Sequence, residues 1–205
     1  IRTTPVLTRD ALYVVGEHDV VTALARDDGR ILWTYAKDPI EEITIAGHAG
    51  LLLADGRLYT AFTDGAVTAL SLADGRVYWE VETALDVDRR PGNVPQFLDV
   101  DTTPVLLGGT LYVASFTAGL YALDPTSGTV AWRDATFVGV TGLAGAGRML
   151  VISSARRGVS LLDLRSRRVR WEKAPERGAP TPPIVTEVGT VIYGETQGSL
   201  LALSL

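Results

Sequence analysis

Apolar and polar positions alternate with a period of two along most of this chain, a pattern typical of half-buried β-strands. Gly, Asp or Pro interrupts the alternation at intervals of about eight to twelve residues. The clearest example is the segment from Thr103 to Arg133, in which turn residues separate four short apolar runs. Gly-Gly and Asp-Pro-Thr-Ser-Gly favour tight reversals between antiparallel strands. The segment therefore predicts one small antiparallel sheet of four strands.

The same pattern is repeated along the sequence. An eleven-residue frame recurs without gaps as ALARDDGRILW, ALSLADGRVYW, ALDPTSGTVAW and LLDLRSRRVRW, and a fifth copy stops at Leu205. The aligned leucines lie 46, 53, 39 and 41 residues apart, at Leu24, Leu70, Leu123, Leu162 and Leu203. A four-stranded repeat of about 40–50 residues is typical of propeller blades. We predict an all-β protein, a single β-propeller domain or fragment over 1–205, with modules at about 3–34, 43–80, 102–133, 141–172 and 181–205.

The tryptophans occupy one position of this repeat. All four end the frame, as Trp33, Trp79, Trp132 and Trp171. Neighbouring propeller blades bury their faces against each other, so a large ring at the end of one strand can fill the wedge between two sheets. Burial of one such ring contributes about 3 kcal/mol. We therefore predict a structural, blade-docking role for these four residues.

Composition limits the possible functions. The chain has 205 residues, of which 46% are hydrophobic and 21% charged, as in an ordinary globular protein. Its net charge of −5 argues against nucleic acid as a general partner. The absence of cysteine excludes disulfides and thiolate metal sites. The N-terminal IRTTPVL begins inside a repeat and has no signal-peptide pattern, so we expect a mature or excised piece.

Two long connections are the first places to look for function, at 34–48 and 80–101, because loops beyond the common lengths are often functional. Their acidic pairs, Asp86 with Asp88 and Asp99 with Asp101, lack the loop pattern of a calcium site and are interpreted as turn and loop residues. His18 and His48 are too few for a metal-site signal. No catalytic motif is present, so we predict neither enzyme activity nor a cofactor.

The fourth module is basic. Between Arg156 and Arg177 it has eight basic and three acidic residues. Charges on a blade edge discourage aggregation between strands, which is the simpler interpretation. A contact for an acidic partner is the alternative.

The repeated A-L-x-x-x-x-G-x-x-x-W pattern resembles that of pyrroloquinoline-quinone-type propellers. Within that superfamily, the segment Leu98 to Arg133, with its Asp-Val-Asp-Thr-Thr-Pro-Val run, is similar to the BamB family of outer-membrane-protein assembly factors. This resemblance implies an eight-bladed propeller without enzymatic activity, in a lipoprotein of the bacterial periplasm that is associated with the outer membrane. It also implies two partners, a periplasmic domain of the barrel-assembly protein and unfolded outer-membrane proteins. The family's acylated N-terminal Cys is missing, and we expect a fragment that would reach the membrane only through such a lipid anchor.

The resemblance also suggests where a partner would bind. By position, one contact loop of the family corresponds to Ile43, Thr44, Ile45 and Ala46. The other corresponds to the region of Arg156 and Arg157, where this chain is basic and the family is acidic. Two alternatives stay open. One is a ligand-sensing or interaction propeller of a signalling protein; the other is a fragment of a quinone-dependent dehydrogenase, whose resemblance implies a vicinal Cys pair that this chain lacks.

Overall fold

A computed structural model of the chain describes residues 3–16, 19–37, 49–83 and 100–205. The described part consists of strands and turns. It contains no helix with the length and apolar character needed to cross a lipid bilayer. The first blade comprises β1 (Val6–Leu7), β2 (Ala11–Val15), β3 (Val20–Ala25) and β4 (Ile31–Ala36). The second comprises β5 (Leu52–Ala54), β6 (Arg57–Ala61), β7 (Ala66–Ser71) and β8 (Val77–Glu82).

The remaining strands form three further sheets. The third blade comprises β9 (Val105–Leu107), β10 (Thr110–Ser115), β11 (Gly119–Leu123) and β12 (Val130–Asp134). The fourth comprises β13 (Val140–Ala146), β14 (Met149–Ser154), β15 (Gly158–Asp163) and β16 (Arg168–Lys173). The fifth comprises β17 (Ile184–Val185), β18 (Thr190–Glu195) and β19 (Ser199–Ser204).

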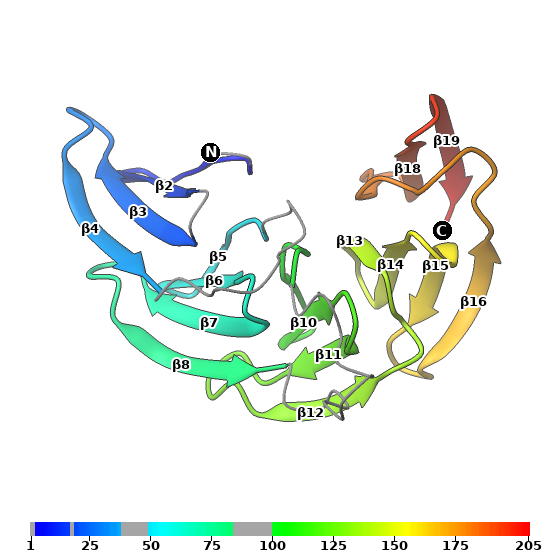
Figure 1. Cartoon of the computed structure of the whole chain (residues 1–205), viewed down its shortest axis with the longest axis horizontal. Helices are drawn as coiled ribbons and strands as arrows, with labels where there is room; N and C mark the ends of the chain where they lie inside the picture. Colours follow the sequence, from blue (N-terminus) through cyan, green and yellow to red (C-terminus); the bar gives the residue numbers. More distant parts are fainter. Residues whose placement is uncertain (1–2, 17–18, 38–48, 84–99) are drawn as a thin grey trace, which may run out of the picture.

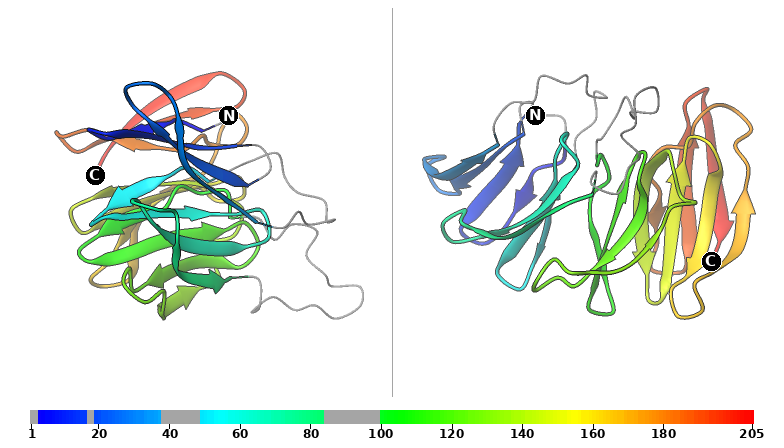
Figure 2. Two further views of the ribbon diagram at one scale, coloured as in Figure 1. Left: turned by 90° about the vertical axis from the view of Figure 1, so that its left-hand side faces the viewer. Right: turned by 60° about the horizontal axis from the view of Figure 1, so that its bottom comes forward.

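Each sheet is antiparallel, and its strands are hydrogen-bonded in sequence order. The sheets stand side by side along an arc, with β4, β8, β12 and β16 on its outer side and the two chain ends on its two end blades (Figure 1). Two further views show that each sheet is twisted and faces the next one (Figure 2). The predicted all-β fold of four-stranded propeller blades is confirmed.

The same β-bulge occurs in the outer strand of the four complete sheets. In the first blade Trp33 is opposite Ala23 and Ile31 is opposite Leu24, so Leu32 has no opposite residue. A bulge inserts one extra residue into a strand and bends it locally, which interrupts the regular alternation of side chains between the two faces of the sheet. It brings Trp33 inward while Leu32 stays 43% exposed. The bulge lies within the eleven-residue frame, and the alternation of apolar and polar residues in the sequence did not predict it.

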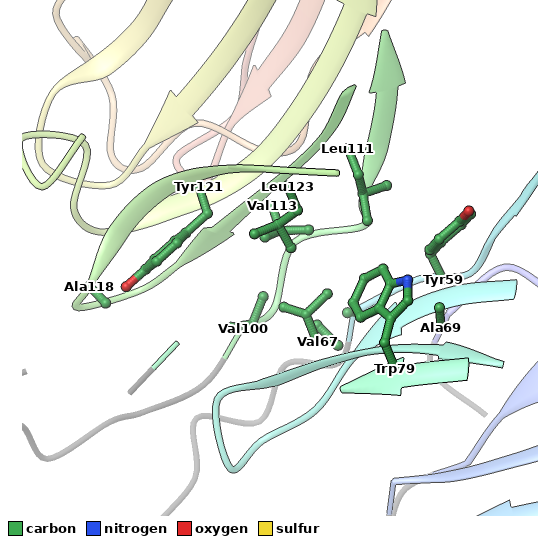
Figure 3. Packing of buried hydrophobic residues seen from close by; sticks show 12 residues of the cluster. Tyr59, Val67, Ala69, Trp79, Val100, Leu111, Val113, Ala118, Tyr121 and Leu123 are labelled. Atoms are coloured by element: carbon green, nitrogen blue, oxygen red, sulfur yellow. The ribbon is translucent and has the colours of Figure 1, made fainter. Parts of the chain in front are cut away.

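The core lies between consecutive blades. Four buried clusters follow the arc, each shared by two neighbouring sheets. Figure 3 shows the cluster between the second and third blades, in which Trp79 rises from β8 toward Leu111. Tyr59, Leu111 and Leu123 are at most 2% exposed. Stability therefore comes chiefly from pairs of sheets, because a single small sheet cannot bury both of its faces.

Candidate protein-binding surface

Two indoles fix the position of one blade on the next. Trp33 Nε1 donates a hydrogen bond to the Leu72 carbonyl at 3.0 Å, and Trp79 Nε1 donates one to the Pro125 carbonyl at 3.0 Å. Both rings are 8% exposed. In each case the acceptor belongs to the turn before the outer strand of the following blade. The end of one repeat is thus bound to the turn of the next repeat.

The glycine of the repeat makes this contact possible. A Cβ atom at Gly75 would lie 2.5 Å from Trp33 Cε3, and one at Gly128 would lie 2.7 Å from Trp79 Cδ2. Both glycines have positive φ, 71° and 74°. The Gly and the Trp of the sequence motif therefore meet across two blades and not within one.

The third and fourth tryptophans are less enclosed. Both are half-buried. Trp132 packs against the cluster between the third and fourth blades, and Trp171 packs against the cluster between the fourth and fifth blades. Arg167 occupies the glycine place of the fourth repeat with φ 53°, and its guanidinium carbon lies 5.1 Å from the centre of the Trp132 ring. A cation above an indole face is attractive. Arg167 thus replaces a close glycine contact with a looser, charged one.

One rim of the arc carries the loops that join the second and third strands of each blade; we call it the hairpin rim. At the first two blades this rim is held by polar contacts between sheets. Asp19 accepts hydrogen bonds from the hydroxyl and the backbone N–H of Thr63, at 2.5 and 3.1 Å. The third blade is linked to the second because the Tyr121 hydroxyl donates to the Thr83 carbonyl at 2.9 Å. These contacts link the first three blades to one another at this rim.

Lys37, which follows β4 of the first blade, forms ion pairs with two carboxylates of the second blade. Its side chain is 15% exposed, and Nζ lies 2.5 Å from Asp64 and 3.0 Å from Glu80. It also lies 5.4 Å from the centre of the Phe62 ring. Burial opposes the charge on Lys37, but its hydrogen bonds to the two carboxylates outweigh burial and raise its pKa. Burial and the neighbouring Glu80 raise the pKa of Tyr35, which donates to Glu80, to about 12.

Arg156 and Arg157, at the hairpin rim of the fourth blade, have different surroundings. Arg157 forms an ion pair with Glu172 and lies 5.0 Å above the centre of the Phe137 ring. Arg156 is exposed, and its backbone N–H donates to the Ser154 hydroxyl at 3.2 Å. Of the two predicted contact residues, Arg156 therefore presents its side chain to solvent, and Arg157 is largely engaged within its own blade.

Several residues singled out from the sequence lie outside the described residues. They are Ile43, Thr44, Ile45, Ala46, His18, His48, Asp86, Asp88 and Asp99. Within the described ranges, no three His, Cys, Asp or Glu side chains are grouped as metal ligands would be. The contact role of residues 43–46 therefore stays a prediction.

A hollow of about 330 Å³ lies among the inner strands, which the sequence did not predict. All five blades line it with residues that lie in or just before their first strands. These residues include Thr3, Val6, Gly50, Asp101, Thr103, Thr141, Gly142 and Pro182. The Thr-Pro sequence that opens three of the repeats was its signal. Because every blade contributes residues near its first strand, this hollow follows from the blade arrangement.

Residues 1–173 match a family model described as outer membrane protein assembly factor BamB. The chain belongs to this family. A BamB relative from Kangiella koreensis is 28% identical over 129 residues, which are 63% of this chain and 32% of the relative. The quinohemoprotein alcohol dehydrogenase ADH-IIG of Pseudomonas putida is 28% identical over 161 residues, covering 75% of this chain and 22% of the enzyme. The chain thus spans about a third or less of these relatives.

The fold agrees with that of a solved member of the BamB family. The crystal structure of BamB from Moraxella catarrhalis superimposes with a TM-score of 0.75 at 21% identity. The match covers 98% of this chain and 63% of that protein. The match to the family model over residues 1–173 confirms the predicted resemblance to the BamB family, and this superposition agrees with its propeller fold.

Proposed function

We propose that this chain is a non-enzymatic protein-binding scaffold of the machinery that assembles β-barrel proteins in the outer membrane. Its partner would be a periplasmic domain of the barrel-assembly protein, and unfolded outer-membrane proteins would be further clients. The place of action would be the periplasm, beside the outer membrane. The match of residues 1–173 to the BamB family is the observation that carries this proposal.

The arrangement of the blades is compatible with a scaffold. The residues that recur in each repeat, Trp and Gly, are used in blade docking, as at Trp79 and Gly128. The loops of the hairpin rim are similar in the second and third blades, Phe-Thr-Asp-Gly and Phe-Thr-Ala-Gly, but the fourth blade has Ala-Arg-Arg-Gly in that place. Binding residues are commonly carried by loops on a rigid frame. We assign partner contact to this rim.

We propose Ile43, Thr44, Ile45 and Ala46, in the connection from the first blade to the second, as an apolar contact, and Arg156 of the hairpin rim as a charged one. Arg157 has a positioning role, because its ion pair with Glu172 and its position over Phe137 hold the loop that carries Arg156. The basic character of this loop indicates an acidic residue on the partner.

The test is a pull-down with the purified periplasmic domains of the barrel-assembly protein. Ile43→Asp with Ile45→Asp is expected to reduce recovery of the partner. Arg156→Glu is expected to slow association and to reduce the slowing of association by added salt, because less attraction is left to screen. Arg30→Glu is the matched control, because Arg30 is an exposed arginine in a turn at the opposite rim. Undiminished recovery with both contact variants, at unchanged thermal midpoints, would reject this surface.

The second candidate is a quinone-dependent dehydrogenase, supported by the 28% identity to the Pseudomonas putida enzyme over 161 residues. The chain lacks the cysteine pair that this resemblance implies. Titration of the purified chain with pyrroloquinoline quinone and calcium distinguishes the two candidates. We expect no saturable change in the quinone absorbance, and a stoichiometric change would favour the enzyme.

A further inference from the structure

Five arginines gather at the end of the fourth blade that lies opposite its hairpin rim. We call them the arginine patch, and they are Arg148, Arg165, Arg167, Arg168 and Arg170. They come from the β13–β14 turn, the β15–β16 turn and β16 itself. The two turns are adjacent, since the backbone N–H of Leu164 donates to the Arg148 carbonyl at 3.0 Å. Segments that are separate in sequence thus form one basic surface.

The patch contains little negative charge. Asp163 is its acidic member, and the side chain is 3% exposed. Its carboxylate accepts from Arg170 Nη2 at 2.7 Å and lies 3.7 Å from Arg148 Nη2. In the part of the chain that the structure describes, no ion pair involves Arg165, Arg167 or Arg168. One buried carboxylate therefore pairs with two of the five arginines, and Arg165 and Arg168 are exposed.

Arg165, Arg167 and Arg170 have no basic counterpart in the other complete repeats, whereas the position of Arg168 is also Arg in the first two. At the position of Arg165 the other complete repeats have Asp27, Ala73 and Thr126, and at the position of Arg170 they have Leu32, Tyr78 and Ala131. The whole chain has a net charge of −5, so the patch is not part of a generally basic surface. Arg167 also keeps a left-handed φ of 53° where its counterparts are glycine. Residues other than glycine rarely adopt this backbone conformation.

The patch lies along a free sheet edge. β16 is the outermost strand of its blade, and only its inner side is paired, with β15. Such an edge presents backbone N–H and C=O groups to an extended chain. Guanidinium groups bind carboxylates with well-directed pairs of hydrogen bonds. An acidic segment in an extended conformation satisfies both features, whereas an anionic lipid surface would use only the charge.

We propose that the edge of β16, with the arginine patch, binds an extended acidic segment of another protein as an added strand. Arg165 and Arg168 supply charge that no carboxylate of the described residues pairs with. Arg148 and Arg170 are held by Asp163. This surface lies at the other end of β15 from Arg156, so it is separate from the hairpin rim.

The test uses the complete chain and a short fluorescent peptide in which Glu alternates with Val, with fluorescence anisotropy as the readout. A peptide with Gln in place of Glu provides the neutral comparison. We expect the acidic peptide alone to bind, and Arg165→Glu with Arg168→Glu to weaken it about tenfold or more at low ionic strength. Isotope-edited infrared spectra of the bound peptide should show added β-strand.

The matched control is Arg30→Glu with Arg76→Glu, because both residues occupy the repeat position of Arg168 and the net charge changes equally. This variant should bind the acidic peptide as the unchanged chain does. Equal weakening by both double variants, or no binding of the peptide, would overturn the proposal. So would capture of the chain by phosphatidylglycerol vesicles that the peptide cannot displace, since the patch would then serve a lipid surface.

Discussion

Substitution of a turn glycine by alanine, which adds one methyl group, tests the contact between that glycine and the indole of the preceding blade. Gly128→Ala places a Cβ 2.7 Å from Trp79 Cδ2 and also 2.9 Å from a methyl carbon of Val81. Gly109→Ala is the matched substitution. Gly109 has φ 77°, against 74° for Gly128, but a Cβ there meets nothing within 4 Å. The pair separates the cost of the docking contact from the cost of the backbone conformation.

The expected difference follows from these two contributions. An alanine in the left-handed region costs about 1–2 kcal/mol, and this penalty is shared by both variants. Overpacking of a well-filled core adds about 1–3 kcal/mol, and this addition applies to Gly128→Ala only. We therefore expect Gly128→Ala to lose about 2 kcal/mol more free energy of unfolding than Gly109→Ala. For a chain of this size, that difference lowers the thermal midpoint by about 4–8 °C more.

Urea unfolding followed by tryptophan fluorescence measures this difference. The native fluorescence spectrum should change in Gly128→Ala, because Trp79 must shift, and should be retained in Gly109→Ala. Equal losses of stability in the two variants would refute the reasoning. The indole would then tolerate a side chain on the turn beneath it, and the glycine would be required only for its φ angle.

Three further predictions follow from the described contacts. In urea titrations, Trp79→Ala should lower the free energy of unfolding by about 4 kcal/mol and Trp132→Ala by about 2 kcal/mol. The smaller loss is expected at Trp132 because its ring is half-buried and is covered by Arg167 where Trp79 meets a glycine. Hydrogen bonds from Arg170 and from backbone N–H groups lower the pKa of Asp163 to about 2. The stability that Asp163 contributes is therefore present above about pH 4 and is lost as the pH falls toward 2. Asp163→Asn should reduce the fall of the thermal midpoint between about pH 4 and about pH 2. A double-mutant cycle of Arg157→Ala and Glu172→Ala should give a coupling of about 1 kcal/mol that falls with added salt, since the pair is partly exposed.

The sequence determined the blades. Strand positions depend on the alternation of side chains and on turn residues such as those at 124–128, and both are local properties. The repeated Trp also predicted that Trp33 and Trp79 would pack between sheets. The family resemblance was visible in residues 98–133, and the match over residues 1–173 confirmed it.

The candidate site was predicted only in part. Arg156 and Arg157 are neighbours in sequence, yet Glu172, fifteen positions after Arg157, decides that Arg157 is paired. Lys37 gave no signal in the sequence, because its partners Asp64 and Glu80 belong to the following repeat. Such pairs depend on how two sheets are oriented, which is a long-range property.

The sequence by itself determined where strands begin and end, because strand and turn preferences act over a few residues. Only the tertiary structure decided that Gly75 meets Trp33 of the preceding repeat, and that Arg148 joins Arg165 and Arg168 at one end of the fourth blade. Sheet twist and the bulge before each Trp set the angle between blades. That angle determines which distant side chains come into contact, and no local pattern of apolar and polar residues specifies it.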